Sequence, residues 1–232
     1  NSTDANGTTI VGRDAGENIT EAQGVTLVGN RAGNAMNTGD HNTGMGYYAL
    51  ATGTGANNNT AFGFEAGRYL GDDGTSNHSS FNTIIGRSAM GGGDTSTPAN
   101  NTAHLNIAIG HSVLGAGTTA SLTASGNTCI GYASMNTATS AANNVSLGYG
   151  GLQTLTSGAR NIAIGNLTLD ALTTQSDNIA IGHNAQTSQS HASATRNISI
   201  GQYAMENMDG FQTDNIAIGY EAMEGGTNNN DI

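Results

Sequence analysis

Hydrophobic and small or polar residues alternate in a short phrase that returns twelve times along the chain and always ends in glycine. Its clearest form is Asn-Ile-Ala-Ile-Gly, at 161–165 and 178–182. The closing glycines are Gly12, Gly29, Gly46, Gly63, Gly86, Gly110, Gly131, Gly148, Gly165, Gly182, Gly201 and Gly219. Six of the eleven intervals between them are 17 residues, and none is shorter. A fixed minimum interval with insertions indicates one structural unit stacked on copies of itself.

Each unit contains a short predicted β-strand. Counting from the closing glycine as position 0, position −1 is always large and apolar, −3 is Thr, Ile or Val, and −2 is mostly small. Alternation with period two and many β-branched residues predict a strand over −4 to −1, with −1 and −3 on one face. We expect the large side chains on the core face. The small side chains at −2 and +3 are expected to form a second face, against a partner chain.

The rest of the unit has a second regular part. Position +4 is Leu or Met in eight repeats, which predicts a second short strand or a corner whose +4 side chain returns to the core. The remaining positions are rich in Ser, Thr, Asn, Gly and Asp, as in solvent-exposed turns. Position −4 is asparagine in ten repeats. These amides either form a hydrogen-bonded ladder along the stack or cap their own turns.

The amino-acid composition also favours a stack of repeats over an ordinary globular domain. Only 36% of the 232 residues are hydrophobic, 35 are glycine and one is proline, so a single unit cannot bury enough apolar surface to fold alone. The sequence therefore predicts an all-β protein, a parallel β-solenoid of about twelve 17-residue coils. We expect one domain over 1–232 with core repeats at about 8–223. The chain starts with Asn1 and has no signal-like segment, which suggests a fragment of a longer polypeptide.

Charge and cysteine content exclude several function classes. The formal charge of −11 disfavours binding to nucleic acid and to anionic membrane surfaces. No apolar run approaches the length of a membrane span. Cys129 is the only cysteine, so there is no intrachain disulfide, and we expect a small buried side chain there.

The phrase Asn-(Thr/Ile)-Ala-(Ile/Phe)-Gly-x-x-Ala-(Leu/Met), repeated over 8–223, resembles the repeat regions of bacteriophage tail fibres and related adhesins. It is more distantly similar to the heads of trimeric autotransporter adhesins. The resemblance implies a left-handed β-roll assembled as a homotrimer. It also implies an extracellular or virion-associated location, a rigid spacer beside other fibre or virion proteins, and attachment to a host glycan or protein receptor. The alternative is a bacterial cell-surface adhesin or extracellular filament subunit.

Candidate chemistry is sparse, and we expect no enzyme, no cofactor and no metal site. Polysaccharide-cleaving enzymes need paired carboxylates, and no repeat position carries acids in register. His111 and His183 share position +1, where an ion could be held only across a three-fold axis.

An ice-binding solenoid needs an outward threonine array, and we expect the recurrent threonines on the core face. Aromatic residues at +1 either bind sugars or pack at corners, and they are Tyr47, Phe64, Tyr132, Tyr149 and Tyr220.

Three insertions, at about 68–80, 91–104 and 115–125, lengthen successive repeats by six, seven and four residues. The binding residues of solenoid proteins often lie in such loops. Surface loops can also lengthen without an effect on function. We expect these loops to cluster at one corner. The candidate receptor contacts in them are Asp72, Asp73, Asn77, His78, Asp94 and His104.

Overall fold

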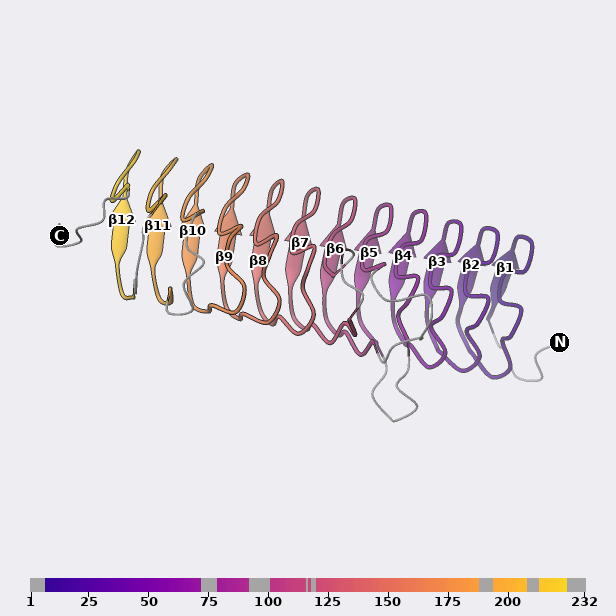
Figure 1. The fold of residues 1–232 in the computed structure, drawn as a ribbon. Helices are drawn as coiled ribbons and strands as arrows, with labels where there is room; N and C mark the ends of the chain where they lie inside the picture. Colours follow the sequence, from indigo (N-terminus) through magenta and orange to yellow (C-terminus); the bar gives the residue numbers. More distant parts are fainter. Residues whose placement is uncertain are drawn as a thin grey trace.

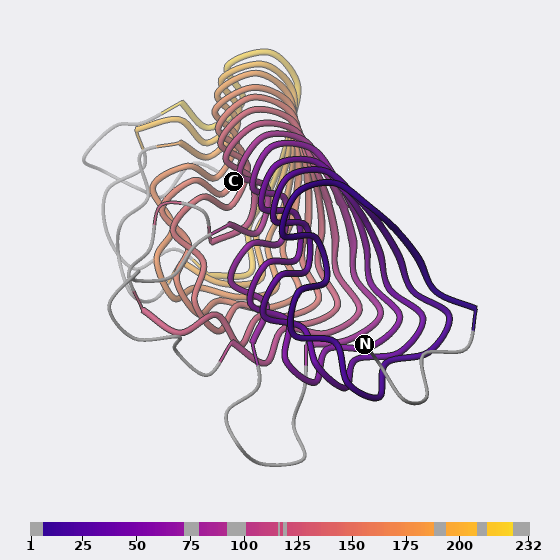
Figure 2. The same ribbon diagram turned by 90° about the vertical axis from the view of Figure 1, so that its right-hand side faces the viewer.

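The computed structural model describes residues 7–71, 79–91, 101–115, 117, 120–187, 194–207 and 213–224. In these ranges the chain is an all-β solenoid whose coils stack in chain order (Figure 1). They contain no helix, and so none that could cross a membrane. Seen along the stack, the coils overlie one another with a gradual rotation (Figure 2). The predicted parallel β-solenoid is confirmed.

Twelve three-residue strands form one parallel sheet. They are β1 (Thr9–Val11), β2 (Thr26–Val28), β3 (Thr43–Met45), β4 (Thr60–Phe62), β5 (Thr83–Ile85), β6 (Ile107–Ile109), β7 (Thr128–Ile130), β8 (Val145–Leu147), β9 (Ile162–Ile164), β10 (Ile179–Ile181), β11 (Ile198–Ile200) and β12 (Ile216–Ile218). Each pairs with its neighbours in sequence, so that residues of the same repeat position lie opposite each other. The register holds across the insertions, since Thr60 pairs with Thr83, and Thr83 with Ile107. The insertions therefore leave the register of the flanking strands unchanged.

The small residue at −2 faces the interior of the solenoid, and the large residues at −3 and −1 face outward. From β2 to β12 the −2 residue is buried, whereas Met45, Phe62 and Ile130 at −1 are each 38% exposed. Our expectation that the large residues form the core face was therefore wrong. Large side chains at +4 and +7, such as Leu152 and Leu155, fill the core instead. The narrow coil then has room for only a small side chain at most −2 positions.

After the glycine the chain turns a corner, and the described part of each coil contains no second strand. Positions +2 and +4 have left-handed backbone conformations, as in Leu167 (φ 52°) and Leu169 (φ 53°). Backbone hydrogen bonds between corners, such as that from the Leu152 N–H to the Thr168 carbonyl oxygen (3.0 Å), hold these residues in place. The +4 side chains are buried as predicted, and they include Leu50, Met90, Leu114, Met135, Leu152, Leu169 and Met205.

The closing glycine is required because the backbone leaves no room for a side chain. From Gly12 to Gly201 these glycines have φ between 127° and 141°, a region that L residues rarely adopt. A Cβ atom on Gly148 would lie 2.2 Å from the carbonyl oxygen of Gly165 in the next coil. Glycine thus permits both the turn and the close approach of successive coils.

The asparagines at −4 form a continuous hydrogen-bonded ladder, which is buried up to Asn197. Both roles considered above occur, because Asn127, Asn178 and Asn215 also donate to a carbonyl oxygen of their own turn. Asn144 Oδ1 accepts hydrogen bonds from the main-chain N–H (2.8 Å) and from Nδ2 (3.0 Å) of Asn161. Asn161 Nδ2 also donates to the carbonyl oxygen of Gln175 (2.9 Å). The main-chain link to the preceding asparagine joins all ten residues at this position. Each buried amide is thereby compensated for its lost hydration.

Candidate functional site

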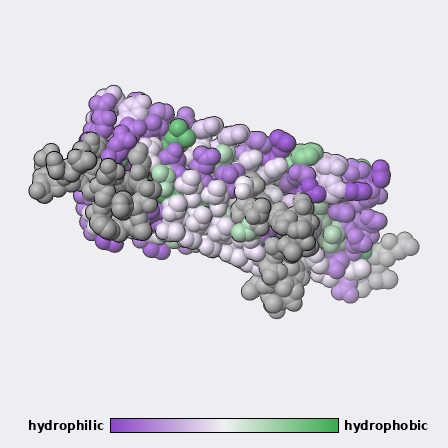
Figure 3. Space-filling view, in the orientation of Figure 1, coloured by the Kyte–Doolittle hydropathy of each residue, from purple (hydrophilic) through white to green (hydrophobic). Residues whose placement is uncertain are grey.

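The side chains at −3 and −1 of β1–β12 form a surface that we call the outer sheet face. It carries only Thr, Ile, Val, Met, Phe and Leu, so none of the chain's charges lies on it. Several of its side chains in inner coils remain 36–40% exposed, including Ile85, Ile107 and Ile181. On the side of the molecule drawn in Figure 3, hydrophobic residues appear only in small separate patches. A continuous uncharged apolar strip is typical of an interaction surface.

The two halves of the outer sheet face differ at −3. The first five strands have threonine there, whereas β8–β12 have Ile or Val. The threonines were expected on the core face, and that expectation was wrong. They lie on the outer sheet face together with the −1 side chains, and they are Thr9, Thr26, Thr43, Thr60, Thr83 and, in β7, Thr128. The reason given above against ice binding therefore no longer holds.

Aromatic rings at +1 stack from coil to coil. The ring centroids of Tyr47 and Phe64 are 5.2 Å apart with planes at 17°, and those of Tyr132 and Tyr149 are 5.3 Å apart with planes at 6°. Stacked rings turn their faces to each other along the stack, although Tyr47 remains 43% and Tyr149 51% exposed. A sugar that stacks on a ring needs a free ring face. The geometry therefore favours packing between coils over sugar binding.

Arg87 and His111 bridge the gap between these two ring pairs. The Arg87 guanidinium carbon lies 5.7 Å from the centroid of Phe64, and Arg87 Nη1 lies 3.2 Å from His111 Nε2. His111 also lies 5.2 Å from the ring of Tyr132. Because a guanidinium can only donate, Nε2 of His111 is the acceptor and its lone pair is engaged. Among the described residues, no three His, Cys, Asp or Glu side chains are grouped to hold a metal ion.

Arginine and aspartate alternate at position −5 in the last four coils, and they form two ion pairs, each between neighbouring coils. Arg160 donates two hydrogen bonds to the carboxylate of Asp177 (2.6 and 2.8 Å), and Arg196 does the same to Asp214 (2.6 and 2.9 Å). These guanidinium groups hold the pKa of both aspartates below the usual value, because they favour the charged carboxylate. The pairs lie at the surface, where each contributes little to stability.

Two large apolar residues also stand at −5, in coils that follow insertions. Phe81 is 59% exposed and Leu105 is 64% exposed. The register places them in neighbouring coils, two residues before Thr83 and its partner Ile107. Sequence analysis missed this pair. The available signal was an apolar residue at a position that is otherwise Gly, His, Asn, Arg or Asp.

The structure covers only one of the six candidate receptor contacts. His104 is half-buried, and its backbone forms parallel bridges to Ser80 and Ser125 in the neighbouring coils. Its role in receptor binding stays a prediction. The other five lie outside the described residues, and they are Asp72, Asp73, Asn77, His78 and Asp94.

Cys129 has the structural position predicted for it. Its side chain is fully buried at −2 of β7, with Sγ 3.2 Å from Sδ of Met135. Burial raises the pKa of the thiol, because the thiolate loses its hydration. The residue therefore serves as a small core side chain.

Comparisons of the chain with protein-family models, with curated proteins and with solved structures find no match.

Proposed function

We propose that this chain is a rigid extracellular fibre segment that assembles as a homotrimer through its outer sheet face. The observation that carries the proposal is the uncharged, largely apolar strip formed by −3 and −1 along all twelve coils. Leaving such a strip in water costs hydrophobic free energy in every coil, and the cost is removed when the strip is covered.

A second copy of the chain fits this strip for geometric reasons. A partner must match twelve coils stacked at the spacing of neighbouring β-strands, and another copy has that length and spacing. The net charge of −11 opposes association, yet none of the residues that form the face is charged. The number of three copies comes from the resemblance to trimeric adhesin heads. The partner surface is thus the large-residue face, in place of the small-residue face proposed from sequence.

Within that assembly, the chain acts as a spacer in a phage tail fibre or similar virion appendage. The tail-fibre resemblance of the repeats and the regular stack of coils support this role. The insertions are the positions where contact with a host receptor is proposed. The alternative assignment is a bacterial surface adhesin or extracellular filament subunit, built from the same unit.

Light scattering after size-exclusion chromatography tests the assembly. The expected mass is three times the 23.3 kDa of one chain. Replacing Ile130→Asp together with Ile181→Asp puts charges on the outer sheet face and should give single chains that retain the β-sheet circular dichroism signal. The matched control, Ser157→Asp with Thr174→Asp, adds the same charges at exposed positions outside the strands and should stay trimeric. A wild-type mass of one chain at all concentrations contradicts the trimer.

Gold-labelled antibodies against the chain test its location in virion and cell preparations from its source. Label along virion appendages supports the tail-fibre role. Label on filaments at the bacterial surface supports the alternative, and label confined to the cell interior contradicts both.

Ice binding is a second candidate, which the outward threonines of β1–β5 favour. These residues form one threonine per coil over five consecutive coils. The neighbouring −1 side chains vary from Val11 to Phe62, so the array is a single rank on an uneven surface. A measurement of thermal hysteresis decides this candidate, since an ice-binding face produces hysteresis and a fibre spacer does not.

A further inference from the structure

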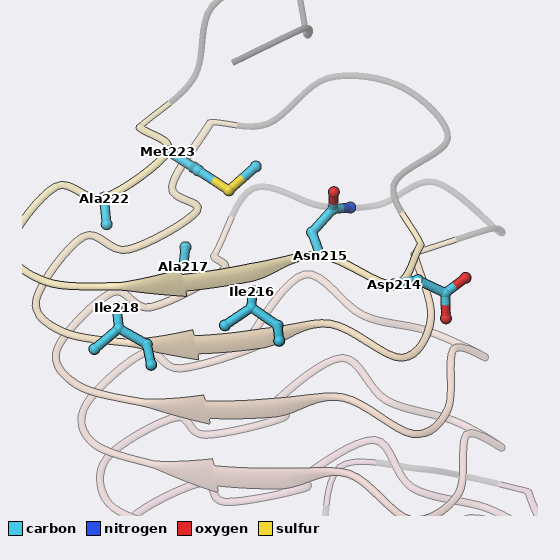
Figure 4. Close-up of a pocket in the computed structure, with 7 residues that line it drawn as sticks. All are labelled: Asp214, Asn215, Ile216, Ala217, Ile218, Ala222 and Met223. Carbon is cyan, nitrogen blue, oxygen red and sulfur yellow. The ribbon is translucent and has the colours of Figure 1, made fainter. Parts of the chain in front are cut away.

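Two rows of residues border the outer sheet face, at position −5 before each strand and at position +1 after the closing glycine. Side chains alternate along a strand, and Figure 4 shows this in the last coil, where Asn215 and Ala217 point to one side of β12 and Ile216 and Ile218 point to the other. None of the residues at −5 or +1 is buried. We call the two rows the −5 edge and the +1 edge.

From β3 to β8 the two edges complement each other in size. In the coils of β3, β4, β7 and β8, the +1 residue is Tyr or Phe and the −5 residue is His, Asn or Gly. In the coils of β5 and β6 the order is reversed, with Arg87 and His111 at +1 and Phe81 and Leu105 at −5. Each of these consecutive coils therefore has one Tyr, Phe or Leu at one edge and none at the other.

A single chain gives no reason for this exchange, because the two edges of one coil are far apart. Positions −5 and +1 are six residues apart on either side of an extended strand, a separation of roughly 20 Å. A side chain at one edge cannot compensate for the side chain at the other edge of its own coil. The pattern therefore points to a contact between two chains.

Phe81 and Leu105 are also unusual in their backbone conformation. Position −5 has a φ between 55° and 71° in all twelve coils, the left-handed region in which Gly, Asn and Asp are the least strained. These three types occupy seven of the twelve positions. Phe81 (φ 59°) and Leu105 (φ 56°) are large side chains in this conformation, and they are 59% and 64% exposed. Neither the local backbone nor packing within the chain favours them, and strained residues of this kind are typical of contact sites.

The symmetry of the proposed trimer brings the two edges together. Around a three-fold axis each copy touches its neighbours by the same rotation, so the −5 edge of one copy meets the +1 edge of the next. A closed ring permits no shift along the axis, because a shift would accumulate over three steps and leave the ring open. Equal coils then face each other, and from β3 to β8 every pair contains one Tyr, Phe or Leu. A shift of one coil in either direction sets two of them together, such as Phe64 and Phe81, and leaves a pair without one, such as His111 and Gly126.

We propose that the two edges meet between copies, coil by coil, with Arg87 and His111 of one copy against Phe81 and Leu105 of the next. This inference rests on the proposed trimer, and it adds the register and the residues at the edges. The exposed guanidinium of Arg87 lies over the Phe81 ring of the neighbouring copy as a cation–π contact, and Leu105 of that copy packs against the His111 ring. Because the coils rotate gradually along the stack (Figure 2), copies held in this way wind around one another.

Disulfide cross-linking tests the register. Asn143→Cys with Tyr149→Cys places one thiol on each edge of the β8 coil, where the proposed contact brings them together between copies. Oxidation should give covalently linked trimers in non-reducing electrophoresis, and a reductant should return them to single chains. In the matched control, Asn143→Cys with His183→Cys, the second thiol is two coils away, roughly 10 Å along the axis and out of disulfide reach, so no linked trimers should form. Cys129 is fully buried and does not compete.

A charge substitution tests the contact of Phe81 itself. Phe81→Arg opposes Arg87 of the neighbouring copy and should raise the dissociation constant of the trimer at least about tenfold in a light-scattering dilution series. Adding Arg87→Glu should restore the wild-type constant, because the two new side chains have opposite charges. The control, Asn58→Arg, puts the same charge at −5 in the β4 coil, where it meets Phe64 and should leave the constant unchanged.

The outcomes separate this inference from the proposed function. Circular dichroism should match the wild type for every variant, because all the replaced side chains are exposed. A wild-type trimer whose Asn143→Cys, Tyr149→Cys variant gives no linked trimers overturns the inference and leaves the proposed function standing. Equal linking in the control, or a Phe81→Arg trimer as tight as the wild type, also overturns it. A wild-type mass of one chain at all concentrations overturns the trimer together with it.

Discussion

β9 and β12 have the same sequence, Ile-Ala-Ile, and yet they have different surroundings. Each follows an asparagine at −4 and ends at a glycine with nearly the same φ, 137° in Gly165 and 135° in Gly219. The isoleucines of β9 are half-buried, whereas Ile216 is 65% and Ile218 is 67% exposed. Among the described residues, β9 has a paired strand on both sides, and β12 has one on a single side.

The exposure of a strand's side chains therefore depends on the coils beside it as well as on its own sequence. The stability of such a stack is approximately the sum of the intrinsic stability of each coil and of the interfaces between adjacent coils. Identical substitutions in the coils of β9 and β12 should therefore have different effects.

The largest difference is expected for Gly165→Ala against Gly219→Ala. Both changes put a side chain where φ is unfavourable, at a cost of about 1–3 kcal/mol. At Gly165 the added Cβ atom would also lie 2.4 Å from the Gly182 carbonyl oxygen, so the coils must separate. We expect Gly165→Ala to lower the free energy of unfolding by roughly 4–6 kcal/mol in urea denaturation, which includes this clash. Equal losses for the two variants would contradict the role assigned to the neighbouring coil.

A smaller difference is expected for Asn161→Ala against Asn215→Ala. Asn161 lies within the ladder, where its Oδ1 accepts from the N–H (3.0 Å) and Nδ2 (3.2 Å) of Asn178. Its removal leaves buried donors without an acceptor, and we expect a loss of about 2–4 kcal/mol. Asn215 is in the last coil, where no later ladder asparagine depends on it among the described residues, and its loss should be about 1 kcal/mol. Thermal denaturation followed by circular dichroism measures both, and a larger effect at Asn215 would refute the ladder's contribution.

The smallest effect is expected for Asp177→Asn against Asp214→Asn. The pKa of both aspartates is lower in the folded chain than in an unfolded one. Their ion pairs therefore stabilise the fold above the usual aspartate pKa, and this contribution is lost as pH falls through the lowered values. Asp177 is favoured by both Arg160 and Arg196, so its replacement should shift the urea midpoint at pH 7 more. Near pH 2 both variants should match the wild type, and a difference that persists there would exclude this origin.

Much of the fold could be predicted from the sequence. The 17-residue interval, the strand before each glycine and the buried +4 side chain all follow from residue types that recur at fixed positions. The asparagine ladder remained one of two alternatives, because a lone amide at a turn has the same pattern whether it bonds to its own coil or to the next. The stack shows that the ladder forms, since it brings Asn161 within hydrogen-bonding distance of Asn144.

The candidate site was less predictable. The small residues at −2, which were expected to face a partner chain, are buried inside the solenoid from β2 to β12, and the exposed pair Phe81 and Leu105 was missed. Such features depend on which coils lie next to each other, and no single repeat carries that information.

The sequence by itself determined the repeat interval and a strand directly before each closing glycine, although the strands begin at −3 and not at −4 as predicted. Glycine and β-branched residues restrict the local backbone in each repeat, which is why these features are readable from sequence. Only the tertiary structure decided which side of the strand is enclosed. A period-two pattern separates two faces and does not say which of them is inside. That choice was made where the coil closes, since Leu152 and Leu155 occupy the narrow interior and leave Ala163 facing it. The large residues of the strand then lie on the outer sheet face.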